Sequence, residues 1–331
     1  MKYLIIIFVT HSKSMYKDIT FIINPSEITA GTRGASLGPY AVITEARKIK
    51  NQLFGKYPIQ TLTDCNYLLD HDTKFPFAKN VEGLINVYEA VSDALASVYN
   101  LHRFPFVFAG DHGSAGGTIA GIKKQFPDKK VGVVWIDAHG DIHSPYTTPS
   151  GNMHGMPVAT ALAEDNLNNK RNHLSEEEVE CWNKLKNLHG ICPKINPEDL
   201  VYVAVRDVEK EEVDLINRLN ISSVSVDDVR IKGTDRILSE INSKLAHCDL
   251  IYISFDVDSM DPLYTSHGTG TPVENGLKPD EAFEIMNGLL KTNKVTCLEF
   301  VEINPCLDEK KNKMAEVAFE MANKLITNHF N

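Results

Sequence analysis

Short apolar segments alternate with longer amphipathic segments along most of the chain. Runs rich in β-branched and aromatic residues predict strands at 19–23, 104–109, 131–136, 201–205, 222–226, 250–255 and 295–301. Between these runs, apolar residues recur at helical spacing within 81–99, 209–219, 235–246, 279–290 and 313–327. Nearly continuous apolar strands that alternate with helices are typical of a parallel sheet covered on both faces. We therefore predict an α/β fold of three layers, α/β/α, with a doubly wound, mostly parallel sheet.

The chain shows no linker, repeat or shift of composition that would divide its 331 residues. We therefore expect a single domain over 15–331, preceded by an N-terminal extension at 1–14. The apolar run at 4–9 within that extension is too short to span a bilayer. The polar segment 165–194 is long for a connection, and we interpret it as a solvated surface loop with a helical turn at 175–185.

Charge and cysteine content narrow the possible partners. The net charge of -10, without any block of Lys and Arg, argues against nucleic acid or an anionic membrane as a partner. Six scattered cysteines without a CxxC pair suggest neither a zinc ribbon nor a disulfide scaffold. We expect a cytoplasmic protein with reduced cysteines that acts on a small molecule.

Several predicted strands end in side chains that commonly bind metals. Asp111 and His112 follow the strand at 104–109, and Asp256 and Asp258 follow the strand at 250–255. The strand at 131–136 leads into Asp137, His139 and Asp141, which share one side of an extended segment because its side-chain period is two. A lone Asp-x-His at a strand end is more often a turn residue. Turn residues do not explain why three apolar strands all end in Asp or His, since charged groups near a core require partners.

The candidate ligands form a hard, mostly oxygen set. They are four carboxylates and two imidazoles, namely Asp137, Asp141, Asp256, Asp258, His112 and His139. Such a set suits divalent ions like manganese better than metals that prefer thiolates. We expect two ions, because four carboxylates around one ion or none would leave like charges facing each other.

Linked motifs along the chain resemble those of the ureohydrolases, and among these most closely the arginases. In order they are AGDHGS at 109–114, DAHGD at 137–141, SGNMHG at 150–155, SFDVD at 254–258 and EINP at 302–305, with the glycine-rich GTRGASLGP at 31–39. The resemblance runs from about residue 18 to the C-terminus. The linked Asp and His motifs are specific to this superfamily, whereas the glycine-rich loop alone would be weak evidence.

The resemblance implies a ligand set and a reaction. One manganese ion would be held by His112, Asp137, Asp141 and Asp256, and a second by His139, Asp137, Asp256 and Asp258. Asp137 and Asp256 would bridge the two ions. A hydroxide between the ions would attack the guanidinium carbon of L-arginine and yield L-ornithine and urea.

The same resemblance assigns roles around the metals. His154 matches the histidine that shuttles protons, and Glu302 matches the acid that anchors the guanidinium group. Thr148, Ser150 and Asn152 match the positions that hold the α-carboxylate, which agmatine lacks. The alternatives are a core histidine at His154, a plain surface acid at Glu302 and an ordinary polar turn at 148–152.

Three positions depart from the usual arginase pattern. Glu209 stands where arginases usually have an aspartate for the α-ammonium group, His143 where many have an asparagine, and Gly113 where a serine often follows the histidine ligand. Agmatine, a guanidino acid or formimidoylglutamate therefore remain alternative substrates. A catalytically silent, metal-binding relative is a further alternative, which the complete set of ligands disfavours. The resemblance also suggests a homo-oligomer, a trimer or hexamer.

One glycine-containing segment has a different interpretation. HGTGTP at 267–272 has two glycines spaced like the start of a dinucleotide-binding motif, but the third is missing and no helix is predicted to follow. We expect this segment to be a loop at the border of the metal cleft.

Overall fold

The computed structural model describes residues 16 and 18–330. The N-terminal extension expected at 1–14 lies outside these residues, so the boundary at 15 stays a prediction.

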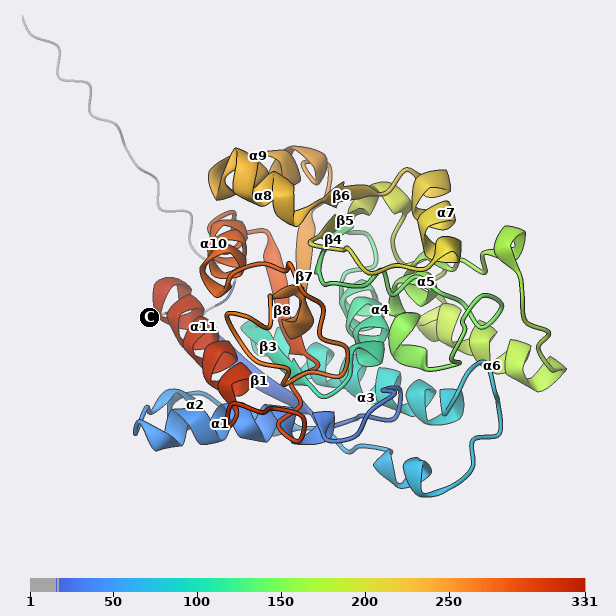
Figure 1. Ribbon diagram of the computed structural model, residues 1–331, viewed down its shortest axis with the longest axis horizontal. Helices are drawn as coiled ribbons and strands as arrows, with labels where there is room; N and C mark the ends of the chain where they lie inside the picture. Colours follow the sequence, from blue (N-terminus) through green and yellow to red (C-terminus); the bar gives the residue numbers. More distant parts are fainter. Residues whose placement is uncertain (1–15, 17, 331) are drawn as a thin grey trace, which may run out of the picture.

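The described residues form one eight-stranded sheet in which every strand pairs in parallel with its neighbours (Figure 1). The strand order is β2-β1-β3-β8-β7-β4-β5-β6. The strands are β1 Asp18–Asn24, β2 Ile59–Thr61, β3 Arg103–Ala109, β4 Val131–Ile136, β5 Leu200–Val203, β6 Ser222–Val224, β7 Leu250–Asp256 and β8 Val295–Val301. The short edge strand β2 is absent from the sequence-based prediction, because its three partly exposed residues contain no apolar run.

Helices cover both faces of the sheet, which confirms the predicted three-layer α/β/α fold. On one face α1, α11, α10, α9 and α8 pack side by side in that order, and on the other α3 packs against α4 and α6, and α4 against α5 (Figure 1). The helices are α1 Gly38–Lys48, α2 Leu53–Lys56, α3 Val81–Asn100, α4 Ala115–Gln125, α5 Pro157–Leu162, α6 Glu176–Lys186, α7 Lys210–Leu219, α8 Val226–Lys232, α9 Thr234–Lys244, α10 Pro279–Leu290 and α11 Lys313–His329.

Helix α4 is another element that the hydrophobic pattern did not predict. Its glycines lower helix propensity, but they also let α4 approach α3 closely. A Cβ atom added at Gly117 would lie 2.7 Å from the Cα atom of Tyr88, and one added at Gly121 would lie 2.8 Å from the Cα atom of Ser92. Tight packing between the helices therefore outweighs the weak intrinsic propensity of this segment.

The interpretation of 165–194 as a solvated loop was wrong in part, because the helical turn expected at 175–185 is present as a helix that packs into the core. Helix α6 runs through this segment and buries Trp182 and Leu185 completely against the core. The Ser175 hydroxyl caps the helix by accepting a bond from the Glu178 N–H, and the Trp182 indole donates to Asp165 Oδ1 over 2.7 Å. The many charged residues of the segment conceal the apolar pair at spacing three, which is all that this helix needs to dock.

The register of the central strands brings their carboxyl ends to one level. Ile136 of β4 pairs with Phe255 of β7, Phe255 pairs with Phe300 of β8, and Phe300 pairs with Phe108 of β3. The residues that follow these four strands therefore emerge together at one edge of the sheet. In open α/β sheets, this edge is where ligands bind.

Candidate metal centre and substrate cleft

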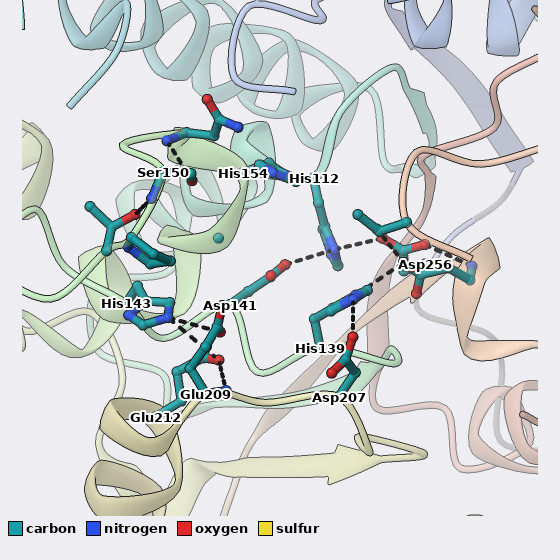
Figure 2. A pocket seen from close by; sticks show the side chains of 16 residues that line it. His112, His139, Asp141, His143, Ser150, His154, Asp207, Glu209, Glu212 and Asp256 are labelled. Carbon is teal, nitrogen blue, oxygen red and sulfur yellow. Dashed lines mark hydrogen bonds and ion pairs between the residues drawn. The ribbon is translucent and has the colours of Figure 1, made fainter. Parts of the chain in front are cut away.

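His112 faces three carboxylates at the carboxyl edge of the sheet. Its Nδ1 atom lies 3.0 Å from Asp137 Oδ2, 3.1 Å from Asp141 Oδ2 and 3.1 Å from Asp256 Oδ2. Figure 2 shows the His112 ring joined by dashed lines to Asp141 and Asp256, which lie on opposite sides of it. All four side chains are almost fully buried, so their polar atoms have little access to bulk water.

A second histidine faces the same edge through a shared carboxylate. His139 Nδ1 lies 3.1 Å from Asp258 Oδ2 and 3.5 Å from Asp137 Oδ1. Asp137 thus presents one oxygen to His112 and the other to His139. Two groups with metal-binding geometry, His112–Asp137–Asp141 and Asp137–His139–Asp258, are therefore joined at Asp137.

The residues around His112 leave its Nδ1 lone pair facing the carboxylates. Its Nε2 atom lies 2.7 Å from Ser254 Oγ, so the tautomer with hydrogen on Nε2 donates to Ser254. The ring also stacks on Trp135 with centroids 4.1 Å apart, while the indole of Trp135 donates to Asp137 Oδ2 over 2.9 Å. A hydrogen bond at the far nitrogen is what usually orients a metal-binding histidine.

The electrostatics of the centre fit a bound cation. Burial, together with the charges of Asp258 and Asp137, raises the pKa of Asp256 well above its ordinary value. Burial and the charge of Asp137 likewise raise the pKa of Asp141 to about 6. These carboxylates lie closer together than their own charges favour, and divalent cations relieve such repulsion. The donor set of oxygens and imidazole nitrogens matches ions such as manganese.

A cleft opens above these groups and brings most of the expected site residues together. The cleft is lined by His112, His139, Asp141, His143, Thr148, Pro149, Ser150, Asn152, His154, Gly155, Asp207, Glu209, Glu212, Asp256, Asp258 and Thr271. Asp137 and Glu302 are almost fully buried beneath this lining. The expectation that 267–272 borders the cleft is confirmed, because Thr271 lines it and donates to Asp258 Oδ2 over 3.0 Å.

The loop at 148–152 presents polar hydrogens to the cleft. Thr148 Oγ1 accepts from the Gly151 N–H over 3.0 Å. Ser150 Oγ accepts from the Asn152 N–H over 3.1 Å (Figure 2). Lys79 Nζ donates to Asn152 Oδ1 over 3.2 Å, which leaves the Asn152 amide hydrogens for another acceptor. Both hydroxyls and the amide can therefore donate to an anionic ligand.

A glycine holds this loop in place. Gly151 has a φ of 77°, and an added Cβ atom would lie 1.9 Å from the carbonyl oxygen of Pro76. The Gly151 carbonyl in turn accepts from the Lys79 N–H over 2.9 Å. Close backbone packing at this point positions the donors of the loop, and a side chain would disrupt it.

His143 and Glu209 form a pair at the opposite wall of the cleft (Figure 2). His143 Nε2 lies 3.0 Å from Glu209 Oε2 and 3.6 Å from Glu212 Oε2. The hydrogen bond from His143 is the main reason why the pKa of Glu209 falls to about 2, against the opposing effect of burial. Burial disfavours charge on His143, but Glu209 and Glu212 outweigh that effect and raise its pKa. Both shifts favour the ion-paired form of His143 and Glu209.

His154 and Glu302 lie near each other beside the metal centre. His154 Nδ1 is 3.8 Å from Glu302 Oε1, and that oxygen also accepts from the His112 N–H over 2.8 Å. Burial disfavours charge on His154, yet Glu302, Asp141 and Asp111 outweigh it and raise the pKa of its imidazole. Glu302 has a φ of 65°, a left-handed conformation that is unusual outside glycine and clusters at functional sites.

Comparison with known proteins agrees with the family that the linked motifs indicated. A model of the arginase family matches residues 17–327. The chain belongs to the arginase family. It is 32% identical to the arginase of Bacillus subtilis over 312 residues, which covers 94% of this chain and 98% of that one. The crystal structure of the B. subtilis arginase aligns with a TM-score of 0.76 at 31% identity, covering 94% of this chain and 98% of that one. The crystal structure of Entamoeba histolytica arginase in complex with L-ornithine has a TM-score of 0.76 at 27% identity, and covers 96% of this chain and 99% of that one.

Membership of the arginase family confirms the resemblance that the linked motifs indicated. The individual roles of the site residues stay predictions, which the geometry above supports to different degrees. Support is strongest for the ligands that share Asp137, and weakest for Glu209, whose carboxylate already has His143 as a partner.

Several residues of this arginase-family site were not found from the sequence. Trp135 and Ser254 point inward from strands β4 and β7, where the apolar pattern makes them look like ordinary core positions. Glu212 appears on the amphipathic pattern of α7 as a surface acid, but it is buried and accepts from the Ile142 N–H over 3.3 Å. Asp207 lies two residues before Glu209, and its Oδ2 is 3.7 Å from His139 Nε2. None of these contacts follows from spacing, since each joins separate loops or strands.

Proposed function

We propose that this chain is an arginase, a metal-dependent hydrolase that cleaves the guanidino C–N bond of L-arginine to give L-ornithine and urea. The observation that best supports this function is the pair of histidine and carboxylate groups joined at Asp137, directly below a cleft with donors on one wall and an acid on the other. The arginase of E. histolytica, which has the same fold, binds L-ornithine in its crystal structure.

The cofactor of this activity is proposed to be two manganese ions. His112, Asp137, Asp141 and Asp256 would hold one ion, and His139, Asp137, Asp256 and Asp258 the other. When bound, the ions lower the pKa of a water molecule toward neutrality and so supply the nucleophile. The oxygen-rich donor set supports manganese over metals that prefer thiolates.

The remaining residues bind and orient the substrate. The donors of Thr148, Ser150 and Asn152 suit the α-carboxylate, and the ionised Glu209 suits the α-ammonium group. With its α-carboxylate at the loop 148–152 and its α-ammonium group at Glu209, the substrate would extend its guanidinium group down to the proposed metal ligands. Glu302, whose Oε1 already accepts from the His112 N–H, has a second oxygen for charge-assisted hydrogen bonds to it.

His154 is proposed to transfer the proton that the reaction requires. It lines the cleft close to Glu302, and its pKa lies above the ordinary histidine value. A protonated imidazole at this position can donate to the nitrogen that leaves as the amine of ornithine.

A second candidate function keeps the chemistry and changes the substrate. Glu209 already has His143 as a partner at 3.0 Å. A guanidino acid without an α-ammonium group would therefore lose less binding free energy at this wall than it would beside an unpaired acid. Agmatine and formimidoylglutamate are further possible substrates within the same superfamily. The loop at 148–152 favours a substrate with a carboxylate, and among these we propose arginine.

Steady-state kinetics with arginine, agmatine and guanidino acids tests the substrate. Arginine should have the highest kcat/KM, and Asn152→Ala should lower it by about tenfold or more, since an unpaired polar group in a closed site costs roughly 1–3 kcal/mol. Agmatine turnover should hardly change in that variant. The exposed Asn100→Ala serves as a matched control. Equal turnover of agmatine and arginine by the wild-type enzyme would refute arginine as the preferred substrate and leave the metal chemistry in place.

We also propose a cytoplasmic homo-oligomer, a trimer or hexamer. All six cysteines are unpaired, which suits a reducing compartment. Light scattering coupled to gel filtration measures the oligomer size directly. Among the described residues, no helix is long and apolar enough to cross a membrane.

A further inference from the structure

A second cluster of metal-binding side chains lies at the opposite edge of the sheet. Asp199 ends a short 3-10 helix, Pro197–Asp199, immediately before β5 begins. His247 and Cys248 lie between the end of α9 and the start of β7. All three residues therefore precede strands, whereas the arginase centre follows the strands at their carboxyl ends. The length of the strands separates this cluster from the arginase centre, so the cluster has no part in the proposed hydrolysis.

The three side chains converge on one point. Asp199 Oδ1 lies 2.8 Å from His247 Nε2, and Cys248 Sγ lies 3.5 Å from His247 Nε2 and 3.7 Å from Asp199 Oδ1. For a tetrahedral zinc ion, bond lengths of about 2.0–2.3 Å place a nitrogen and a sulfur ligand about 3.5 Å apart, and an oxygen and a nitrogen ligand about 3.3 Å apart. The two distances that involve sulfur already match this geometry. The remaining distance would need to open by about half an ångström.

Neighbouring backbone groups orient two of the three donors. The His247 Nδ1 atom lies 3.1 Å from the Lys244 carbonyl oxygen, which can only accept, so Nδ1 holds a hydrogen. In the neutral ring the lone pair is then on Nε2, pointing toward Asp199 Oδ1. A lone pair and a carboxylate oxygen 2.8 Å apart repel unless a cation lies between them, either a proton or a metal ion.

Asp199 is held in the same manner. Its other oxygen, Oδ2, accepts from the backbone N–H and the side-chain amide of Asn196, over 2.9 and 3.3 Å. Oδ1 is thereby directed at His247 and Cys248. Such outer hydrogen bonds to a histidine and a carboxylate are the usual support of a metal site.

Cys248 supplies the donor that sets the metal preference. The side chain is buried, and Gly132 of β4 leaves room for it, since a Cβ atom there would lie 3.1 Å from Cys248 Sγ. Burial and the charge of Asp199 raise the pKa of the thiol to about 12, so metal binding must release the thiol proton to solvent. About 35% of the His247 side chain is exposed, which gives an ion access and leaves a position for water as a fourth ligand.

We propose that Asp199, His247 and Cys248 bind a single zinc ion, or a metal of similar softness, at a site distinct from the arginase centre. The sulfur, nitrogen and oxygen donors favour zinc, whereas the oxygen-rich centre favours manganese. The bound ion links the segment before β7 to the segment before β5, which are 48 residues apart at Asp199 and His247. Its role is structural, because it connects the starts of β5 and β7. These two strands are not neighbours in the sheet, since β4 lies between them.

Cobalt titration tests this site in the enzyme already loaded with manganese. A thiolate bound to Co²⁺ gives an intense charge-transfer absorption, which the carboxylate and imidazole ligands of the arginase centre cannot produce. We expect one saturable band at one cobalt per chain, and its stoichiometric loss when zinc is added. The band should be absent in Cys248→Ala and in His247→Ala, the latter being a partly exposed position where folding is not at risk.

The control variant keeps the cluster and removes the exposed thiols. Cys192 and Cys306 are both exposed, so the double variant Cys192→Ser/Cys306→Ser should retain the full band. Absence of the band from folded wild-type enzyme, judged by circular dichroism, would refute the site and identify the cation between His247 and Asp199 as a proton. A band that persists in Cys248→Ala or in His247→Ala would refute it equally. Arginine turnover enters none of these measurements, so the proposed function is tested separately.

Discussion

Asp137 uses both of its carboxylate oxygens at the proposed metal centre. Oδ2 faces the His112 ring and also accepts from the Trp135 indole. Oδ1 faces the His139 ring and accepts from the backbone N–H of His139 over 2.8 Å. Burial raises the pKa of this acid, but the two histidines outweigh that effect and lower it far below its ordinary value. An ionised, buried carboxylate with partners on both sides is well suited to bridge two cations.

Replacing Asp137 by alanine should strip metal from the enzyme and abolish urea formation. The reason is that loss of the shared carboxylate leaves both ions with too few ligands and too little compensating charge. Inductively coupled plasma mass spectrometry gives the metal content per chain, and Asp93→Ala, at an exposed acid, is the control. Two manganese ions per chain retained in Asp137→Ala would contradict the bridging role.

Replacing His154 by asparagine should lower kcat by about 10²-fold or less, as expected for the loss of a proton-transfer group. Metal content should stay the same, because His154 is not among the proposed ligands. Turnover and metal analysis are measured on the same preparation, with the exposed His173→Asn as control. Loss of metal would instead identify His154 as a ligand, and unchanged turnover would return it to the interpretation as a core histidine.

Helix α6 is anchored at its C-terminus by a buried lysine. Lys194 Nζ donates to the Lys186 carbonyl over 2.7 Å and to the Leu185 carbonyl over 3.3 Å. A cation at this end of a helix satisfies carbonyls that have no partner within the helix. Burial nevertheless lowers the pKa of Lys194 from its ordinary value of 10.5 to about 8. The stability of this element should therefore depend on pH.

We expect Lys194 to make folding more favourable as the pH rises from about 8 to 10.5. Within this window the unfolded chain binds the proton and the folded chain does not, so the free energy of unfolding rises with pH. Below the window both states are charged and the cost of burying the charge is complete, while above it both are neutral and the cost disappears. Urea denaturation across the window should show wild type gaining stability relative to Lys194→Met. A constant difference would contradict the prediction, and Lys184→Met, exposed on the same helix, is the control.

Three strands of the sheet, β3, β4 and β7, deliver the proposed ligands to one small volume, so metal binding should stabilise the whole fold. Adding manganese should raise the unfolding temperature of metal-free enzyme, because a ligand that binds only the folded state stabilises it by about 2.7 kcal/mol at a hundredfold excess over Kd. Differential scanning fluorimetry after chelation and after manganese readdition measures the shift. Asp137→Ala should show a much smaller shift. An equal unfolding temperature with and without manganese would argue against a metal centre at these strand ends.

Much of this fold follows from local patterns in the chain. The predicted strands at 131–136 and 295–301 coincide with β4 and β8, and the predicted helix at 279–290 coincides with α10. The ends of such strands could be predicted from the sequence, because the apolar run stops at a charged residue such as Asp137 or Asp256. Helix α4 could not be read in this way, because its glycines weaken the periodic signal that tight packing later overrides. Helix α6 was predicted only as a helical turn at 175–185 within a loop, because its charged residues weaken the same signal.

The order of residues alone sets the layered fold, the types of ligand and the family. These properties depend on short spacings, such as the alternation that puts Asp137, His139 and Asp141 on one side of the chain. Contacts across long separations depend instead on strand register and helix packing. Ser254 reaches His112 from 142 residues away, and Cys248 reaches Asp199 from 49. No periodic pattern links such pairs, because their distance in space is fixed by how neighbouring strands align and not by how far apart they are in the chain.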